Sequence, residues 1–448
     1  MNKYVGRFSR RDFLKAVAAV SGGLAARPWL DISYKALAQD VASMPPITVL
    51  INDSPWFPGF AAMVELYTET TGNEVNLDVT PFAGMLDKTR NATQANESEY
   101  DAVAITEQNI PFFYNSGLLS PITDIDSGYE LDSNIISYGD AARWDSDLGI
   151  NGPDGTLLGV PINGNIQLYY YRADLFEENG ITPPQTYDEM EAIAEQLATP
   201  RLFGNANRAN PIWWEFGAYV DSYGAPYVGL NAETGNWEVG FEKPEGLEAV
   251  NRWLTLGRTW APQNYADLGQ GDLIALMSSG RLAQVHMVGA AAPNFDNPES
   301  STVVGMMGAT VAPGLTAETR SPRSGMWVMS HPSNLPLERQ QAGLEFVKWL
   351  TTKDNQVAYT LAGAIPVRQD AYEELSTDDA VGWWTGAFAE STPFIKPETR
   401  LPETPIIRDS VSTRMAQAYV DEISAEEAVE LMGSEIRAIM EDAGYSMG

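Results

Sequence analysis

The chain has no cysteine and only two histidines among its 448 residues. The absence of cysteine excludes disulfide bonds, thiol catalysis, cysteine-ligated metal centres and a lipid-anchored cysteine. His286 and His331 lie far apart in the sequence and lack metal-ligand spacing, so we expect no metal site. Motifs of nucleotide-binding loops, zinc proteases and serine hydrolases are also missing, and no cofactor is expected.

Basic residues are scarce. Lysine and arginine total 28 against 60 acidic residues, which gives a formal net charge of −32 at pH 7. Because nucleic-acid binding depends on clustered lysine and arginine, this composition excludes nucleic acid as a partner. Salt screens the self-repulsion of an acidic surface, so the composition favours a saline habitat. An ordinary acidic exported protein is the alternative.

Long apolar runs are absent after the N-terminal segment. No run in that remaining sequence approaches the ~18 apolar residues needed to span a bilayer. The chain is nevertheless longer than the ~250–300 residues at which a single hydrophobic core stops growing. Two lobes are therefore expected.

The N-terminal segment has the pattern of an export signal. Arg10 and Arg11 lie in a twin-arginine motif at residues 9–15, a weakly apolar stretch follows, and residues 36–38 form a small-x-small cleavage site. We expect residues 1–38 to be a twin-arginine signal peptide and the protein to be exported after it has folded. A chance pair of arginines is the alternative.

Predicted strands and helices alternate after this segment. Such alternation predicts a parallel sheet with right-handed crossovers, whose ligands lie beyond the carboxyl ends of the strands. The predicted strands are residues 47–51, 75–79, 102–105 and 166–171. The predicted helices include one carrying Phe60, Met63, Val64 and Tyr67, followed by residues 85–96, 173–179, 245–260 and 337–350 and two helices within 412–443. Thr186 and Glu189 have the spacing of a capping box.

Several segments, in order along the chain, resemble the extracellular solute-binding proteins of carbohydrate ABC transporters. Residues 159–165 (Gly-Val-Pro-Ile-Asn-Gly-Asn) and 170–176 (Tyr-Tyr-Arg-Ala-Asp-Leu-Phe) are similar to the hinge strand of that family and the element after it. The other similar segments are residues 67–75, 180–189, 279–283 and 363–368. The resemblance spans about residues 47 to 368.

This resemblance implies an α/β, two-lobed periplasmic-binding-protein fold. Each lobe is expected to be a mainly parallel sheet flanked by helices, and a multi-stranded hinge joins the lobes. The N-terminal lobe would comprise residues 45–166 and 325–372, and the C-terminal lobe residues 167–324 and 373–448. The implied function is capture of a sugar, polyol or small glycoside by lobe closure, and delivery to ABC transporter permease subunits. A periplasmic monomer without enzymatic activity is expected.

A sugar site needs aromatic platforms for the C–H face of the ring and polar groups for its hydroxyls. Residues of these types follow the predicted strands, precede the hinge strand or begin a helix of the second lobe. The resemblance places Trp327 beside the segment that returns to the first lobe. The candidate ligand-binding residues are Asp53, Trp56, Glu107, Gln108, Asn163, Asn165, Trp213, Trp214, Glu215, His286, Trp327 and Arg368.

Several of these side chains could instead serve the fold. Adjacent residues of a helix point in different directions, so one of Trp213 and Trp214 is expected in the core. Structural roles at six further positions would be a helix cap at Asp53, a solvated loop acid at Glu107, turn formation at Asn163 and Asn165, a core imidazole at His286 and an ion pair at Arg368.

Two different functions remain open from the sequence. An exported glycosidase or lyase would use paired carboxylates, which are plentiful in this chain. A non-sugar ligand such as an amine or a phosphoester is the second, and a phosphoester would need Arg208, Arg323 or Arg368 to offset the acidic surroundings. Residues 145–149 faintly resemble a calcium-binding loop, but the glutamate that closes such a loop is missing.

The charge excess makes stability depend on salt. We expect the free energy of unfolding to rise between 0.1 M and 1 M sodium chloride, because the Debye length falls from ~10 Å to ~3 Å over that range. Urea unfolding at the two salt concentrations measures the change. A free energy that stays level or falls would contradict the prediction.

Overall fold

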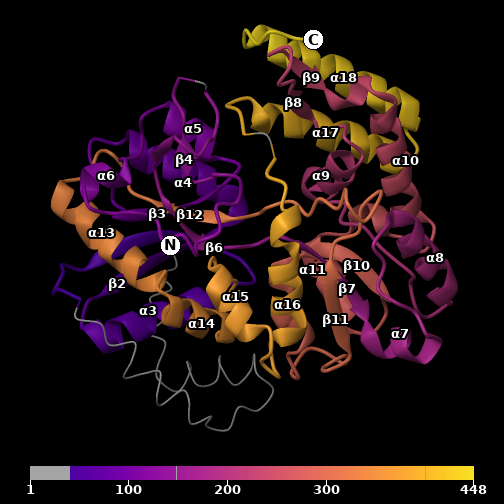
Figure 1. Ribbon diagram of the computed structural model, residues 1–448, viewed down its shortest axis with the longest axis horizontal. Helices are drawn as coiled ribbons and strands as arrows, with labels where there is room; N and C mark the ends of the chain where they lie inside the picture. The colour runs from indigo at the N-terminus through magenta and orange to yellow at the C-terminus, as the bar shows by residue number, and fades with distance from the viewer. Residues whose placement is uncertain (1–40, 148, 399) are drawn as a thin grey trace.

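The computed structural model describes residues 41–147, 149–398 and 400–448, so the predicted signal peptide lies outside it. Figure 1 shows two lobes side by side, with chain segments crossing between them. The predicted two-lobed α/β fold is confirmed. No helix within these ranges combines the length and the apolar character needed to cross a membrane.

The first lobe is built on a five-stranded sheet in the order β2–β1–β3–β12–β6. β1 pairs in parallel with β2 and β3, whereas β12 is antiparallel to both of its neighbours. The strands are β1 (Ile47–Asp53), β2 (Val75–Pro81), β3 (Ala102–Thr106), β6 (Val160–Asn163) and β12 (Trp327–Ser330). β3, β6 and β12 are buried along their whole length, so the centre of this sheet forms the core of the lobe.

The second lobe contains a three-stranded sheet in the order β10–β7–β11. Its strands are β7 (Gln167–Arg172), β10 (Gln284–Val288) and β11 (Met307–Val311). Both outer strands are antiparallel to β7, so the prediction of a mainly parallel sheet is wrong for this lobe. β7 leads away from the first lobe and both of its partners run back toward it. Hydrophobic periodicity identifies a buried strand but carries no information on its direction.

Helices surround both sheets (Figure 1). Those of the first lobe are α3 (Phe57–Thr71), α4 (Phe82–Gln94), α5 (Ile110–Asn115), α6 (Ile122–Ile125), α13 (Leu337–Leu350), α14 (Lys353–Leu361) and α15 (Gln369–Leu375). Those of the second are α7 (Ala173–Asn179), α8 (Tyr187–Leu197), α9 (Ile212–Ser222), α10 (Pro244–Arg258), α11 (Gln270–Ser278), α12 (Ala292–Phe295), α16 (Gly382–Ser391), α17 (Thr404–Tyr419) and α18 (Ala425–Asp442). Two-stranded hairpins are β4 (Arg143–Trp144) with β5 (Thr156–Leu157) and β8 (Val228–Leu230) with β9 (Trp237–Val239).

Local sequence signals set several helix ends as predicted. α3 ends at Gly72, which adopts a φ of 77° that disfavours residues with a Cβ. Thr186 caps α8, and Glu189 completes the predicted capping box by accepting from the backbone N–H of Thr186. These signals act within a few residues, which is why the sequence alone locates them.

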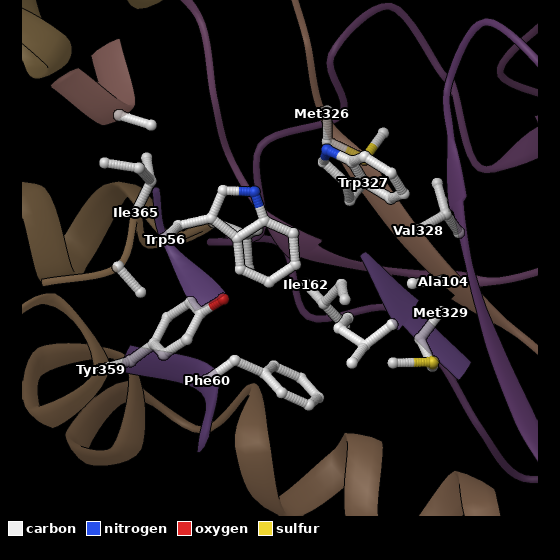
Figure 2. Close-up of a cluster of buried hydrophobic side chains, with 14 of the residues drawn as sticks. Trp56, Phe60, Ala104, Ile162, Met326, Trp327, Val328, Met329, Tyr359 and Ile365 are labelled. Carbon is white, nitrogen blue, oxygen red and sulfur yellow. The ribbon is translucent and has the colours of Figure 1, made fainter. Parts of the chain in front are cut away.

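Trp56 lies at the start of α3 and packs into the core of the first lobe. Its ring lies 6.1 Å from that of Phe60 and 5.9 Å from that of Trp327, between ring centroids. Figure 2 shows its indole among Phe60, Tyr359 and Ile365, with Trp327 on the other side. Trp56 and Trp327 are 2% and 5% exposed. The two indoles therefore fix the carboxyl end of β1 against the beginning of β12.

Three described segments carry the chain between the lobes, joining β6 to β7, β11 to β12 and α15 to α16. The first crossing passes through Gly164. A Cβ at this position would lie 2.1 Å from Tyr138 Oη and 2.2 Å from the carbonyl oxygen of Pro366. Only glycine allows so close an approach of the crossing to the first lobe.

Arg400 links the two lobes through buried polar contacts. It follows α16 in the chain but reaches the first lobe, where it donates to the Glu107 carboxylate (2.5 Å) and to the carbonyl oxygens of Tyr138 (2.8 Å) and Gly139 (3.0 Å). Glu107 also accepts from the hydroxyl of Ser324 at 2.8 Å. Burial raises the pKa of Glu107, while Arg400 and Ser324 act in the opposite direction.

A second buried ionic cluster lies beside it in the second lobe. The guanidinium of Arg323 pairs with Asp221 (2.8 Å) and with Glu398 (3.5 Å), and Glu398 also binds Arg408. Gly217 of α9 makes room for Arg323, because a Cβ there would lie 2.0 Å from the guanidinium carbon. Residues 398 to 408 thus contribute charges to both clusters.

Arg400→Leu should strongly destabilise the fold, because it leaves the Glu107 carboxylate buried without a cation. Breaking a buried pair in this way costs about 3–5 kcal/mol. Arg437→Leu, which breaks a pair with Glu242 at the surface, should cost about 1 kcal/mol or less. Urea denaturation measures both, and adding Glu107→Gln to Arg400→Leu should recover part of the loss. Equal losses for the two single variants would contradict the prediction.

Candidate ligand-binding cleft

A cleft lies where the two lobes meet, and it has two adjoining compartments. The compartment that contains Asp53, Gln108 and Asn165, called the polar compartment, has a volume of about 290 Å³. The one that contains Met85, Leu86 and Phe113, called the apolar compartment, has a volume of about 220 Å³. Phe82, Thr106, Trp213 and Trp327 line both compartments. Because these four residues come from α4, β3, α9 and β12, the cleft is formed by both lobes.

The first-lobe wall of the polar compartment comes from the carboxyl ends of β1 and β3. Asp53, Trp56 and Gln108 line it, as does Trp327 at the start of β12. Parallel neighbouring strands end at the same edge of a sheet, which places these residues together. The structure therefore brings these four predicted candidates into one cleft.

Two further residues of this wall, Asn52 and Thr106, lie at the predicted strand ends but were not among the candidate ligand-binding residues. Both belong to the strands themselves, and they are 2% and 5% exposed. Asn52 Oδ1, Thr106 Oγ1 and the nearby Ser54 Oγ are buried and have no hydrogen-bond partner in the protein. Buried polar atoms without partners are costly and rare in folded proteins. These three atoms lie at the cleft wall without a partner in the protein, so their hydrogen-bonding capacity is unused there.

The second-lobe wall begins at α9. Trp214 is buried, and its indole Nε1 donates to the carbonyl oxygen of Ser324 at 3.0 Å. Trp213 is half-buried, and the guanidinium of Arg408 lies 4.0 Å from its ring centroid. Both tryptophans line the polar compartment, but only Trp213 also lines the apolar one. Trp213 is therefore the more accessible of the pair, as adjacent positions on a helix require.

Asn165 and Arg208 complete the polar groups of this wall together with Gln270. The side-chain oxygen of Asn165 accepts from the backbone N–H of Ala290 at 3.1 Å, so the side chain is held in place by the second lobe. Arg208 donates to Glu215 Oε1 at 3.3 Å and to Gln270 Oε1 at 3.2 Å. Sequence reasoning missed Gln270, because a glutamine at a helix start belongs to no motif.

Glu107, Asn163 and Arg368 do not line the cleft. Glu107 is buried in its pair with Arg400, so it is neither the predicted ligand contact nor a solvated acid. The Asn163 side chain accepts from the backbone N–H of Ile365 at 3.3 Å. Arg368 pairs with Asp132 and Asp370, each at 2.8 Å. Each of these residues is occupied by a partner distant in sequence or by a structural ion pair.

His286 also lies outside the cleft lining. It sits on β10, 4% exposed, with its ring 6.0 Å from that of Tyr219 and neither ring nitrogen hydrogen-bonded. Burial lowers the pKa of His286 to about 3. The imidazole is thus neutral and packs as a core residue, which corrects its place among the ligand-binding candidates. Among the described residues no group of three or more histidines and acids is placed to hold a metal ion.

Glu215 lies behind the cleft wall, where it contacts Arg208. It is 2% exposed and its Oε2 has no hydrogen-bond partner. Burial raises the pKa of Glu215 to about 7, and Arg208 opposes this effect. The carboxyl group therefore acts on the cleft through Arg208 rather than by lining it.

Comparison with known proteins identifies the type of protein. The sequence profile of the family described as bacterial extracellular solute-binding protein matches residues 62–385. An erythritol/L-threitol-binding protein of Mycolicibacterium smegmatis is 20% identical over 74% of this chain and 72% of its own. A mannitol-binding protein of Pseudomonas aeruginosa is 23% identical over 58% of each chain.

A solved structure shares the fold. An ABC transporter solute-binding protein from Agrobacterium radiobacter, in complex with ribitol, superposes with a TM-score of 0.72 at 19% sequence identity. The superposition covers 89% of this chain and 99% of the other. The arrangement of the two lobes described above is therefore that of a known class of binding proteins.

Glu215→Gln tests the buried carboxyl group. Because its pKa in the folded protein, about 7, exceeds the ordinary value of 4.5, the folded state keeps a proton that the unfolded chain releases. The stability from this proton is present below pH 4.5 and is lost as the pH rises through 7. One pKa unit corresponds to about 1.4 kcal/mol, so the advantage of wild type over Glu215→Gln should shrink by up to about 3 kcal/mol.

Urea denaturation of the two proteins across this pH range measures that difference. Glu238→Gln is the control, because Asn231 and Lys243 lower the pKa of Glu238 and the stability difference should change with pH in the opposite sense. A wild-type advantage over Glu215→Gln that stays constant or grows with rising pH would contradict the assignment.

Proposed function

The chain belongs to the family of bacterial extracellular solute-binding proteins, and on this premise we propose that it captures a sugar, a polyol or a small glycoside for an ABC transporter. The relatives named above bind erythritol, threitol and mannitol, which are polyols. The ligand would lie in the cleft between the lobes and pass from there to the permease subunits of the transporter.

The observation that carries this proposal is the combination of groups in the polar compartment. Trp213 from one lobe and Trp327 from the other line the same space as the unpartnered Asn52 Oδ1 and Thr106 Oγ1. A polyhydroxylated ligand offers C–H faces to the rings and hydroxyl groups to those two oxygens. Asp53, Gln108 and Asn165 supply further acceptors and donors at the rim.

The charges in the cleft favour a neutral ligand over a phosphoester. Arg208 is the cation of the polar compartment, and it is already paired with Glu215. Arg323 and Arg368, the other arginines that would offset a phosphate, are paired with Asp221 and Asp370 outside the cleft. Asp53 adds a negative charge to the compartment. A phosphate group would meet repulsion here without an uncompensated cation.

The arrangement also favours binding over hydrolysis. Glycosidases use two carboxyl groups on opposite sides of the scissile bond. Asp53 is the acidic residue among those lining the polar compartment in the described part of the chain. Glu107 and Glu215, the other acids among the predicted candidates, are paired with Arg400 and Arg208. We therefore assign no catalytic role to the cleft.

Binding is proposed to proceed by closure of the lobes. A ligand that contacts both walls of the cleft binds the closed arrangement more tightly than the open one, and this difference shifts the population toward closure. The lobes would correspond to residues 45–166 with 325–372 and 167–324 with 373–448. Residues 1–38 would direct export by the twin-arginine pathway to the periplasm, where the protein would act as a monomer.

Trp213→Ala should weaken ligand binding by about tenfold, which corresponds to about 1.4 kcal/mol. The reason is the loss of one aromatic wall that both compartments share. Isothermal titration calorimetry measures the dissociation constant, after a thermal-shift screen of sugars and polyols has identified a ligand. At 100 times its dissociation constant, that ligand should stabilise the protein by about 2.7 kcal/mol.

Trp383→Ala is the matched control for this variant. Trp383 is a half-buried tryptophan of the second lobe whose indole donates to Asp296 at 2.7 Å, away from the cleft lining. It should bind the ligand as wild type does. Equal affinity of both variants would place the ligand elsewhere, and turnover of a bound oligosaccharide would contradict the proposed function. Trp327 is less suitable for this test, because at 5% exposure its truncation also removes core packing.

A further inference from the structure

Arg208 is held at three points in the wall of the polar compartment. Its Nε donates to the carbonyl oxygen of Asn210 at 2.8 Å, and its Nη1 donates to Glu215 Oε1 at 3.3 Å and to Gln270 Oε1 at 3.2 Å. Its Nη2 has no hydrogen-bond partner among the residues that the structure describes, and this nitrogen is not buried. Since Arg208 lines the polar compartment, Nη2 is left to donate to a molecule bound there.

Gln270, the first residue of α11, has a fixed amide orientation. A guanidinium group can only donate, so the atom of Gln270 that meets Arg208 must be the oxygen Oε1. The nitrogen Nε2 is the free end of the amide, and within the described part of the chain it has no partner and is not buried. Because a hydrogen bond joins the two side chains, Arg208 Nη2 and Gln270 Nε2 form a pair of free donors on one wall, called the donor pair.

Backbone pairing keeps the two side chains of the donor pair together. The backbone N–H of Ala209 donates to the carbonyl oxygen of Leu268 at 2.7 Å. Arg208 is the residue directly before Ala209, and Gln270 lies two residues after Leu268, so this bond joins the two segments that carry the donor pair. The donor pair is therefore in place before a ligand arrives, and binding has little side-chain freedom to remove there.

The opposite wall of the compartment offers acceptors. Gln108 donates its Nε2 to the buried carboxylate of Glu107 at 3.3 Å, which makes Oε1 the free end of that amide. Asp53, an exposed acid of the same wall, can only accept when it is ionised. A hydroxyl group suits both walls, because its oxygen accepts from the donor pair while its proton is free for an acceptor of the other lobe.

We propose that Arg208 and Gln270 determine specificity by binding two neighbouring oxygen atoms of the ligand, and that these oxygens belong to a vicinal diol. Each side chain donates one free N–H group to one oxygen of the diol. This inference rests on the proposed function, because it takes the polar compartment as the site of a sugar or polyol. A carboxylate also has two neighbouring oxygens, but Arg208 is already paired with Glu215 and Asp53 adds a negative charge to the compartment.

The test removes one contact at a time from the protein and from the ligand. Erythritol, D-mannitol, D-glucose, D-galactose and maltose are titrated calorimetrically against wild type, followed by D-gluconate and by the monodeoxy forms of the compound that binds most tightly. Arg208→Lys keeps the charge but loses the guanidinium fork, and Gln270→Met removes the amide while Arg208 keeps its pair with Glu215. Each variant should bind that compound about tenfold more weakly, a difference of about 1.4 kcal/mol.

Arg414→Lys and Gln417→Met are the matched controls. Arg414 also binds a carboxylate, that of Glu435 at 3.0 Å, and a glutamine oxygen, that of Gln417 at 2.9 Å. Both residues belong to α17 of the second lobe and line neither compartment of the cleft. The two controls should bind the compound as wild type does, and a tenfold loss in them as well would overturn the assignment.

The deoxy forms identify the hydroxyl group that each side chain contacts. The form that lacks the hydroxyl bound by Arg208 should bind wild type and Arg208→Lys equally, because the contact is already missing. The form that lacks the neighbouring hydroxyl should bind wild type and Gln270→Met equally for the same reason. A merely structural role of either residue would instead lower the affinity of every form by the same factor.

Each outcome decides between the inference and the function on which it rests. Unchanged affinity in Arg208→Lys and Gln270→Met, or losses shared equally by all deoxy forms, would overturn the contact and leave the proposed function standing. Two coupled hydroxyls that are not neighbours would overturn the vicinal diol. Tighter binding of D-gluconate than of every neutral compound would show that the donor pair binds a carboxylate. Absence of saturable binding across the whole panel would overturn the proposed function itself.

Discussion

The buried ion pair between Glu107 and Arg400 is the interaction on which the junction of the lobes depends. Glu107 follows β3 of the first lobe and Arg400 precedes α17 of the second, and both are almost fully buried. Ser324 binds the same carboxylate from the segment that returns to β12. One carboxylate thus ties together three parts of the chain that meet beside the cleft. The two charges pair with each other within the protein, so removing either one would leave the other buried and unpaired.

The neighbouring cluster extends this arrangement toward the ligand site. Glu398 holds Arg408, Arg408 covers one face of Trp213, and Trp213 lines both compartments of the cleft. The position of an aromatic wall therefore follows from a buried ion pair that packs against it. Gly217 contributes by leaving room for Arg323, which also pairs with Glu398. The cleft and the junction are consequently parts of one packed structure.

The sequence predicted the features that depend on neighbouring residues. The capping box at Thr186 is local, and the rule for parallel strands places Asp53 and Gln108 at the cleft from their own strands alone. Glu107 follows β3 as Gln108 does, but its side chain pairs with Arg400, which is 293 positions away in the sequence, and therefore does not line the cleft. Asn52 and Thr106 directly follow the predicted strands 47–51 and 102–105, at the ends where ligands were expected, but they were not chosen as candidates, because their burial as part of the strands shows only in the structure. The antiparallel pairing of the second sheet was not predicted either. The direction of β10 depends on the path of the long connection from β7, which a local sequence pattern does not show.

The place of β12 in the first sheet has a consequence for synthesis. β12 lies between β3 and β6, and β6 pairs with no other strand of that sheet. As the nascent chain leaves the ribosome, β6 must wait for the whole segment up to Ser330, including the second sheet, before it gains its partner. The first lobe is therefore completed after the strands of the second have emerged, although it begins first. A truncated chain ending at Asn163 would lack the strand that attaches β6 and would expose the apolar edge of β3 to chaperones and proteases.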